Sequence, residues 1–116
     1  MIVGVQGTSS FSDYQVFLRA MAVSMSSLKE EDLYFYIYSA GPANVNDMVS
    51  EFVNLSERGM KSRGKKIKMY KVAPSWITEN IKDVDYFAFL SKEKEQVSKL
   101  IGDAQENNVD YGIFRY

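Results

Sequence analysis

The chain has 116 residues, of which 46% are hydrophobic, and its formal net charge is −1. This length is that of one ordinary domain, and the apolar fraction is sufficient for a hydrophobic core. Cysteine and histidine are both absent, which excludes disulfides, thiolate zinc sites, cysteine nucleophiles and histidine bases. The composition therefore favours a binding protein over an enzyme, and we predict no catalytic residue, no metal site and no cofactor.

The sequence also lacks the segments that direct a chain to a membrane. It contains no apolar run long enough to span a bilayer. A charged segment followed by a short apolar stretch, which is typical of a secretory signal, is missing as well. We therefore expect a cytoplasmic protein without membrane contact.

The first predicted elements are a buried strand and a helix that follows it closely. The apolar run Ile2–Gln6 predicts the strand, and the polar segment Gly7–Ser10 follows it. Ser12 and Gln15 have the spacing of a capping box, which predicts a helix starting after Ser12. A glycine turn between a buried strand and a helix is how α/β domains form pockets for phosphate groups.

The central part of the chain continues the alternation of strand and helix. Apolar residues at helical spacing extend the first helix to Leu28, and Leu33–Tyr38 reads as a strand that is apolar on both faces. Its tyrosines are interpreted most simply as a packed strand face. The segment Ser39–Pro42 ends this strand. We predict a second helix that is capped by Asn44 and stops at Gly59.

From Ile67 onwards the sequence predicts three further strands and one long helix, with a short irregular piece between the first two strands. Lysines within the predicted strand Ile67–Val72 place it at a sheet edge. A second strand is predicted over Val84–Leu90. A third long helix, capped by Ser91, and a final strand over Tyr111–Tyr116 complete the chain. The residues expected on the buried side of that helix are Val97, Leu100, Ile101 and Ala104.

Strands that alternate with helices imply right-handed crossovers and a parallel sheet. We therefore predict an α/β fold: one Rossmann-like three-layer domain over 1–116. Its mainly parallel five-stranded sheet would have the order 3-2-1-4-5, with helices on both faces.

In such a sheet, ligands bind beyond the carboxyl ends of the strands, where the winding reverses. With this order the reversal lies between the first and fourth strands, so Gly7–Ser10 would face Ser91 and Lys92. A tryptophan after the third strand could stack on a base. The predicted ligand-binding residues are Gly7, Thr8, Ser9, Ser10, Gly41, Trp76, Ser91 and Lys92.

A run of basic residues without an acidic one lies between 58 and 71. Such a segment on an otherwise acidic chain could contact nucleic acid. The residues proposed for this contact are Arg58, Lys61, Arg63, Lys65 and Lys66. The alternative interpretation is a solvated loop beside a strand whose charges prevent pairing with another molecule.

Over about its first 80 residues the chain resembles a known family. Gly7–Asp13 resembles the Gly-Ser-Arg-x-Phe-x-Asp opening of the SLOG superfamily, Rossmann-like proteins related to the DprA and LOG groups. Ser39–Asn46 looks like its Gly-Gly-Ala-x-Gly-x-Asp element, and Ala73–Trp76 is similar to its Ala-Asp-Trp segment. The resemblance implies the fold and a nucleotide pocket. Ser9 stands where the family has an arginine, and Asn46 where it has an aspartate. The arginine and glutamate of its phosphoribohydrolase members have no match here, so hydrolysis is not implied.

Three functional hypotheses follow. The first is a protein that binds a nucleotide or a nucleotide-derived signal, as a sensor or as a sequestering protein of the viral counter-defence kind. The second is a homo-oligomeric interaction module with a degenerate pocket, paired through exposed aromatic residues such as Phe114 and Tyr116. The third is an enzyme acting on a nucleotide bond with Asp13 or Asp47 as acid or base, although no matched pair of carboxylates is visible.

Overall fold

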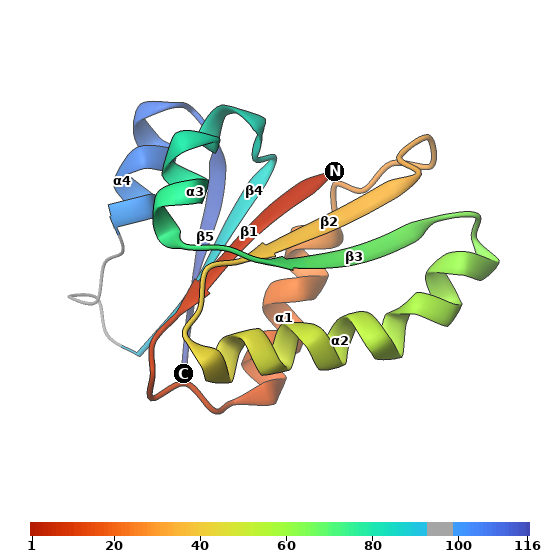
Figure 1. The fold of residues 1–116 in the computed structure, drawn as a ribbon, viewed down its shortest axis with the longest axis horizontal. Helices are drawn as coiled ribbons and strands as arrows, with labels where there is room; N and C mark the ends of the chain where they lie inside the picture. The colour runs from red at the N-terminus through yellow and green to blue at the C-terminus, as the bar shows by residue number, and fades with distance from the viewer. Residues whose placement is uncertain (93–98) are drawn as a thin grey trace.

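A computed structural model describes residues 1–92 and 99–116, and its described strands form one parallel sheet (Figure 1). The order β3-β2-β1-β4-β5 confirms the predicted order and the predicted α/β class. Each strand lies within two residues of its predicted bounds. The strands are β1 (Ile2–Gly7), β2 (Tyr34–Ser39), β3 (Lys66–Lys71), β4 (Tyr86–Ser91) and β5 (Asp110–Arg115).

The helices cover both faces of the sheet, as predicted. The helices α1 (Tyr14–Met25) and α2 (Ala43–Ser62) pack on one face. On the other face lie α3 (Pro74–Glu79), the short 3-10 helix η1 (Ile81–Asp83) and α4 (Lys99–Glu106). In the part of the chain that the structure describes, no helix is both long and apolar enough to cross a membrane.

A separate hydrophobic cluster fills the space on each side of the sheet. Phe17 and Met21 of α1 and Phe35 of β2 are fully buried in the cluster beneath α1 and α2. Ile77 of α3 and Phe87 of β4 are fully buried in the cluster beneath α3 and α4. Burial of one such side chain contributes about 1.5–3 kcal/mol of transfer free energy, so both clusters hold the layers together.

The first helix begins one residue later than the capping box predicted. Its N-cap is Asp13, whose Oδ1 accepts hydrogen bonds from the amides of Gln15 (3.1 Å) and Val16 (3.2 Å). With this cap Gln15 is the second helical residue, so it cannot complete a capping box with Ser12. Serine and aspartate are both good N-cap residues, and the spacing alone selected the wrong one.

Both predicted ends of the second helix were wrong. The N-cap of α2 is Pro42, and Asn44 lies within the first turn. At the other end, α2 continues past Gly59 to Ser62. The added turn carries Met60, which is 4% exposed and packs into the cluster beneath α1 and α2. Tertiary packing of one methionine therefore outweighs the stop signal of the glycine.

The strand β2 is buried on one face only, which corrects the prediction of a covered strand. Phe35 and Ile37 are fully buried towards α2, whereas Tyr34, on the opposite face, is 47% exposed. Figure 1 shows the reason: α3 and α4 lie together over β4 and β5, and much of β2 and β3 extends past them.

The tyrosines of this open face predict a pH dependence of stability. Partial burial, followed by the nearby Tyr70 and Tyr36, raises the pKa of Tyr38 above its usual value. The unfolded chain therefore loses this proton first as the pH rises, and stability falls as the pH passes from about 10 through the folded pKa. We expect Tyr38→Phe to keep more of its stability at pH ~11 than the natural chain does.

Urea midpoints measured on both sides of that pH window test this prediction. At pH ~8 the phenol is neutral in both states, and the two proteins should differ little. A parallel loss of stability in both proteins between the two pH values would show that Tyr38 does not contribute.

Candidate functional site

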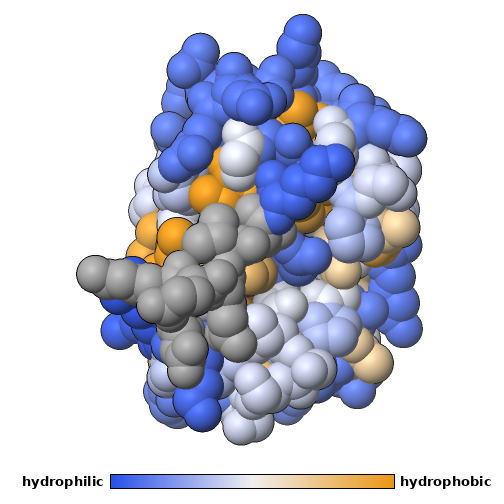
Figure 2. Space-filling view, turned by 90° about the vertical axis from the view of Figure 1, so that its left-hand side faces the viewer, coloured by the Kyte–Doolittle hydropathy of each residue, from blue (hydrophilic) through white to orange (hydrophobic). Residues whose placement is uncertain are grey.

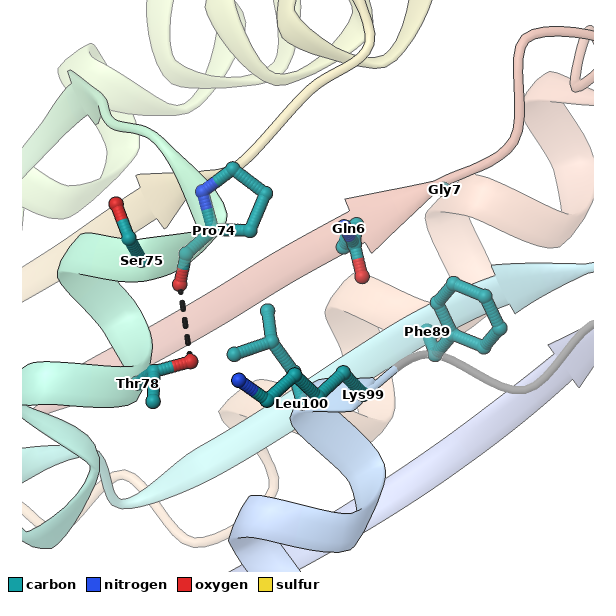
Figure 3. Close-up of a pocket in the computed structure, with 8 residues that line it drawn as sticks. All are labelled: Gln6, Gly7, Pro74, Ser75, Thr78, Phe89, Lys99 and Leu100. Atoms are coloured by element: carbon teal, nitrogen blue, oxygen red, sulfur yellow. Dashed lines mark hydrogen bonds between the residues drawn. The ribbon is translucent and has the colours of Figure 1, made fainter.

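A cavity of about 370 Å³ opens at the carboxyl ends of β1 and β4, between α3 and α4 (Figure 3). This is the place where the winding of the sheet reverses, because β1 is followed by β2 on one side and paired with β4 on the other. The described residues that line the cavity come from two strands and two helices. They are Gln6, Gly7, Pro74, Ser75, Thr78, Phe89, Lys99 and Leu100.

The walls of the cavity combine apolar and polar groups. Phe89 and Leu100 are buried and supply apolar surface. Ser75 and Thr78 supply hydroxyls, and Lys99 supplies a cation. A mainly apolar cavity of a few hundred Å³ with a few convergent polar groups is typical of a small-molecule site. Figure 2 faces this end of the molecule and shows orange, hydrophobic side chains among blue, hydrophilic ones.

The helices on either side of the cavity are joined by a hydrogen bond. Thr78 Oγ1 donates to Asp103 Oδ2 of α4 at 2.9 Å. The same hydroxyl lies 3.3 Å from the carbonyl oxygen of Pro74, at the start of its own helix (Figure 3). This hydroxyl therefore ties α3 to α4 beside the cavity.

The loop after β1 is held from one side by the loop after β2. The amide of Gly7 donates to the carbonyl oxygen of Gly41 at 3.0 Å, and Gly41 has a φ of +84°, which favours glycine. Asn44 Nδ2 donates to the carbonyl oxygens of Thr8 (3.2 Å) and Phe11 (2.6 Å). Asn44, predicted as a helix cap, instead fixes the shape of the loop between β1 and α1.

Tyr116 holds the same loop from the opposite side. Its hydroxyl forms hydrogen bonds with Thr8 Oγ1 and, at 2.8 Å, with Ser10 Oγ. The edge of its ring packs on Phe11, with ring centroids 4.7 Å apart. Two of the three hydroxyls that were predicted to face a ligand, those of Thr8 and Ser10, therefore have a partner. Among the described residues, none bonds to the backbone amides of Thr8, Ser9 and Ser10.

The other predicted ligand residues lie at this edge in different settings. The strand register pairs Gly7 with Leu90 and Ser91 with Arg115, so the carboxyl ends of β1, β4 and β5 lie side by side. Ser91 is buried at the end of β4, and Lys92 is exposed. The first described residue of α4 is Lys99. Val97 and the start of the helix that Ser91 was predicted to cap therefore lie outside the described residues.

Trp76 points away from the cavity. Its ring stacks on Tyr38 with centroids 4.3 Å apart, over the open face of β2. It is absent from the described lining, whereas its helix neighbours Ser75 and Thr78 are present. The sequence reasoning did not single out these two hydroxyls or Lys99. Of these three residues only Ser75 lies in a segment, Ala73–Trp76, that the sequence analysis had singled out.

Residues proposed for the competing hypotheses lie as follows. Asp13 caps α1 through its carboxylate, and Asp47 is exposed on α2. Phe114, expected to be exposed, is only 8% exposed and packs in the core. In the described ranges, no group of three or more histidine, cysteine, aspartate or glutamate side chains is placed to hold a metal ion.

Lys65 differs from the rest of the basic run. It is 5% exposed, and its Nζ donates to the carbonyl oxygens of Lys29 (2.8 Å), Glu30 (3.0 Å) and Asp32. A buried ammonium group with three carbonyl partners is part of the folded structure. It does not face a partner in solution.

Comparison with known proteins supports the fold. No protein-family model matches the sequence, and no curated protein matches it either. Among solved structures, the universal stress protein from Archaeoglobus fulgidus is similar, with a TM-score of 0.51 and 12% sequence identity. The match covers 99% of this chain and 94% of that one. At this identity the likeness shows a shared Rossmann-like α/β fold.

Proposed function

We propose that this protein binds a nucleotide or a nucleotide-derived signal in the cavity between β1, β4, α3 and α4. The observation that carries the proposal is the position of the cavity, which lies where the winding of the sheet reverses. Gly7 and the cationic side chain of Lys99 both line it. The resemblance to the SLOG superfamily supports the same ligand class, and membership in that superfamily is part of the proposal.

Each part of such a ligand has suitable groups near it. The ammonium group of Lys99 is a donor for a phosphate. The backbone amides of Thr8–Ser10, which have no hydrogen-bond partner among the described residues, are further donors. Phe89 offers apolar surface for a ring. At the edge of that ring the Ser75 hydroxyl offers a hydrogen bond, and the Thr78 oxygen, whose proton bonds Asp103, can accept one. A phosphate would therefore lie at the rim of the cavity and the base inside it.

Isothermal titration against a panel of nucleotides, including cyclic nucleotides and ADP-ribose, tests the proposal. Loss of one charge-assisted contact costs about 1.5 kcal/mol or more, so Lys99→Gln should weaken binding by about tenfold or more. Lys82→Gln removes another exposed lysine, which lies in η1 outside the cavity lining, and should leave binding unchanged. Absence of heat with every compound, or an equal loss in both variants, would contradict the proposal.

A further inference from the structure

Five aromatic rings form a continuous row on the open face of β2 and β3. We call this the aromatic row; its members are Tyr34, Tyr36, Tyr38, Tyr70 and Trp76. Trp76 stacks on Tyr38, and Tyr38 stacks on Tyr70 at 4.9 Å. Tyr36 lies 5.9 Å from Tyr70 in a tilted arrangement and stacks on Tyr34 at 5.7 Å.

The pleat of the strands brings these side chains to one face. Alternate residues of β2 point to the same side, and the register pairs Tyr38 with Tyr70 of β3. Since the helices α3 and α4 lie over the other half of the sheet, the row reaches solvent. Tyr34 is 47% exposed and Tyr70 41% exposed. A contiguous exposed aromatic surface of this kind is uncommon unless it meets a partner.

Charge is distributed unevenly around the aromatic row. Lys66 and Lys68 of the edge strand β3 are exposed, and the register sets them beside Tyr34 and Tyr36. They therefore form a positive border along the outer side of the row. Three acidic residues, Glu31, Asp32 and Asp85, line a separate hollow at the amino ends of the strands. Tyr34 and Tyr36 line the same hollow.

We propose that the aromatic row binds single-stranded nucleic acid, with the phosphate backbone along Lys66 and Lys68 and the bases over the rings. Surfaces that bind single strands combine a basic track with aromatic side chains on which bases stack. The lysines of β3 suit the phosphates, while Glu31, Asp32 and Asp85 disfavour a phosphate at the amino ends of the strands. A duplex would fit poorly, because its bases are already stacked on each other.

This site is independent of the proposed nucleotide cavity. The two lie on different sides of α3, which directs Ser75 and Thr78 to the cavity and Trp76 to the row. The site also differs from one formed by the whole basic run, because it uses only Lys66 and Lys68 and requires the rings of the aromatic row. Either site could therefore fail without the other.

Binding of fluorescein-labelled oligothymidylate of about 16 nucleotides, the upper end of common site sizes, tests the rings. Tyr70→Ala should weaken binding roughly five- to 150-fold, the range for loss of one stacked base. Tyr111→Ala is the matched control, because Tyr111 is 37% exposed on the opposite edge strand and should not matter. Equal affinities for the two variants would overturn the proposal.

The salt dependence of the same binding tests the lysines. Each single-strand phosphate contact adds about 0.7 to the slope of log affinity against log salt. The double variant Lys66→Gln/Lys68→Gln should therefore lower the magnitude of the slope by about 1.4. Lys61→Gln/Arg63→Gln removes two exposed charges from the basic run and should leave the slope unchanged. An equal decrease in both double variants would overturn the assignment to β3.

The tryptophan fluorescence of the natural protein tests the proposal without any substitution, so the result does not depend on how well a variant folds. Trp76 is the sole tryptophan of the chain and belongs to the row, so oligothymidylate should change its fluorescence in a saturable way. Saturable quenching supports the proposal, and unchanged fluorescence at low salt overturns it.

Sedimentation measures whether the protein forms a dimer, which is the alternative use of this surface. If the protein forms a dimer that Tyr70→Ala dissociates and oligothymidylate does not bind, the row is an interface between two copies.

Discussion

Replacing Lys65 with methionine is expected to lower the free energy of unfolding by about 2–4 kcal/mol, because three carbonyl oxygens lose their charged hydrogen-bond donor. These carbonyls belong to the turn between α1 and β2, which Lys65 reaches from just before β3. Methionine preserves most of the apolar stem but offers no donor. Urea unfolding of the two proteins measures the difference.

The adjacent lysine provides the control for this experiment. Lys66→Met makes the same chemical change at an exposed position, one residue along the chain. Exposed substitutions usually change stability by less than about 0.5 kcal/mol. Equal destabilisation in Lys65→Met and Lys66→Met would show that the three carbonyl contacts do not stabilise the fold.

Lys65 also shows where sequence reasoning reaches its limit. In the sequence it is one lysine among several between 58 and 71, and no local pattern separates it from Lys66. Its burial depends on a turn more than thirty residues earlier, which comes within reach only after β2 and β3 have paired. The same limit applies to Asn44, whose two carbonyl partners lie in the loop after β1.

The order of elements was predictable because its signals are local. Buried strands such as Ile2–Gln6 and the amphipathic stretches after them identify an α/β fold without tertiary information. The lysines Lys68 and Lys71 within the predicted strand correctly placed β3 at the edge of the sheet. The open face of β2 was not predictable, since a tyrosine fits a half-exposed strand as well as a covered one.

The candidate site was predictable only at its strand ends. Gly7 follows directly from the topology, because the last residue of β1 must lie where the winding reverses. Thr78 and Lys99 lie on helices, and the direction in which a helical side chain points depends on how that helix packs. Trp76 and Ser75 are neighbours in sequence, yet α3 sends one to the aromatic row and the other to the cavity.

Gly7→Ala is expected to destabilise the protein by about 1–3 kcal/mol, the usual range for overpacking a filled core. A Cβ at this position would lie 2.6 Å from Cγ2 of Val45 and 3.3 Å from Cβ of Leu90. Val45 is fully buried at the start of α2, so it cannot move without displacing the helix. Displacement of α2 would also disturb the hydrogen bonds from Asn44 that shape the loop after β1. We therefore expect the nucleotide binding proposed for the cavity to weaken together with stability.

A double-mutant cycle with Val45→Ala identifies the cause. Truncation of Val45 removes the methyl group that the new Cβ would strike, so the two substitutions together should cost less than the sum of their separate costs, by about 0.5–3 kcal/mol. Gly59→Ala is the control, because a Cβ there meets nothing within 4 Å. In the helix α2 it should stabilise the protein by about 0.5–1 kcal/mol. Strict additivity of Gly7→Ala and Val45→Ala would mean that the contact between β1 and α2 does not explain why a glycine is needed at this position.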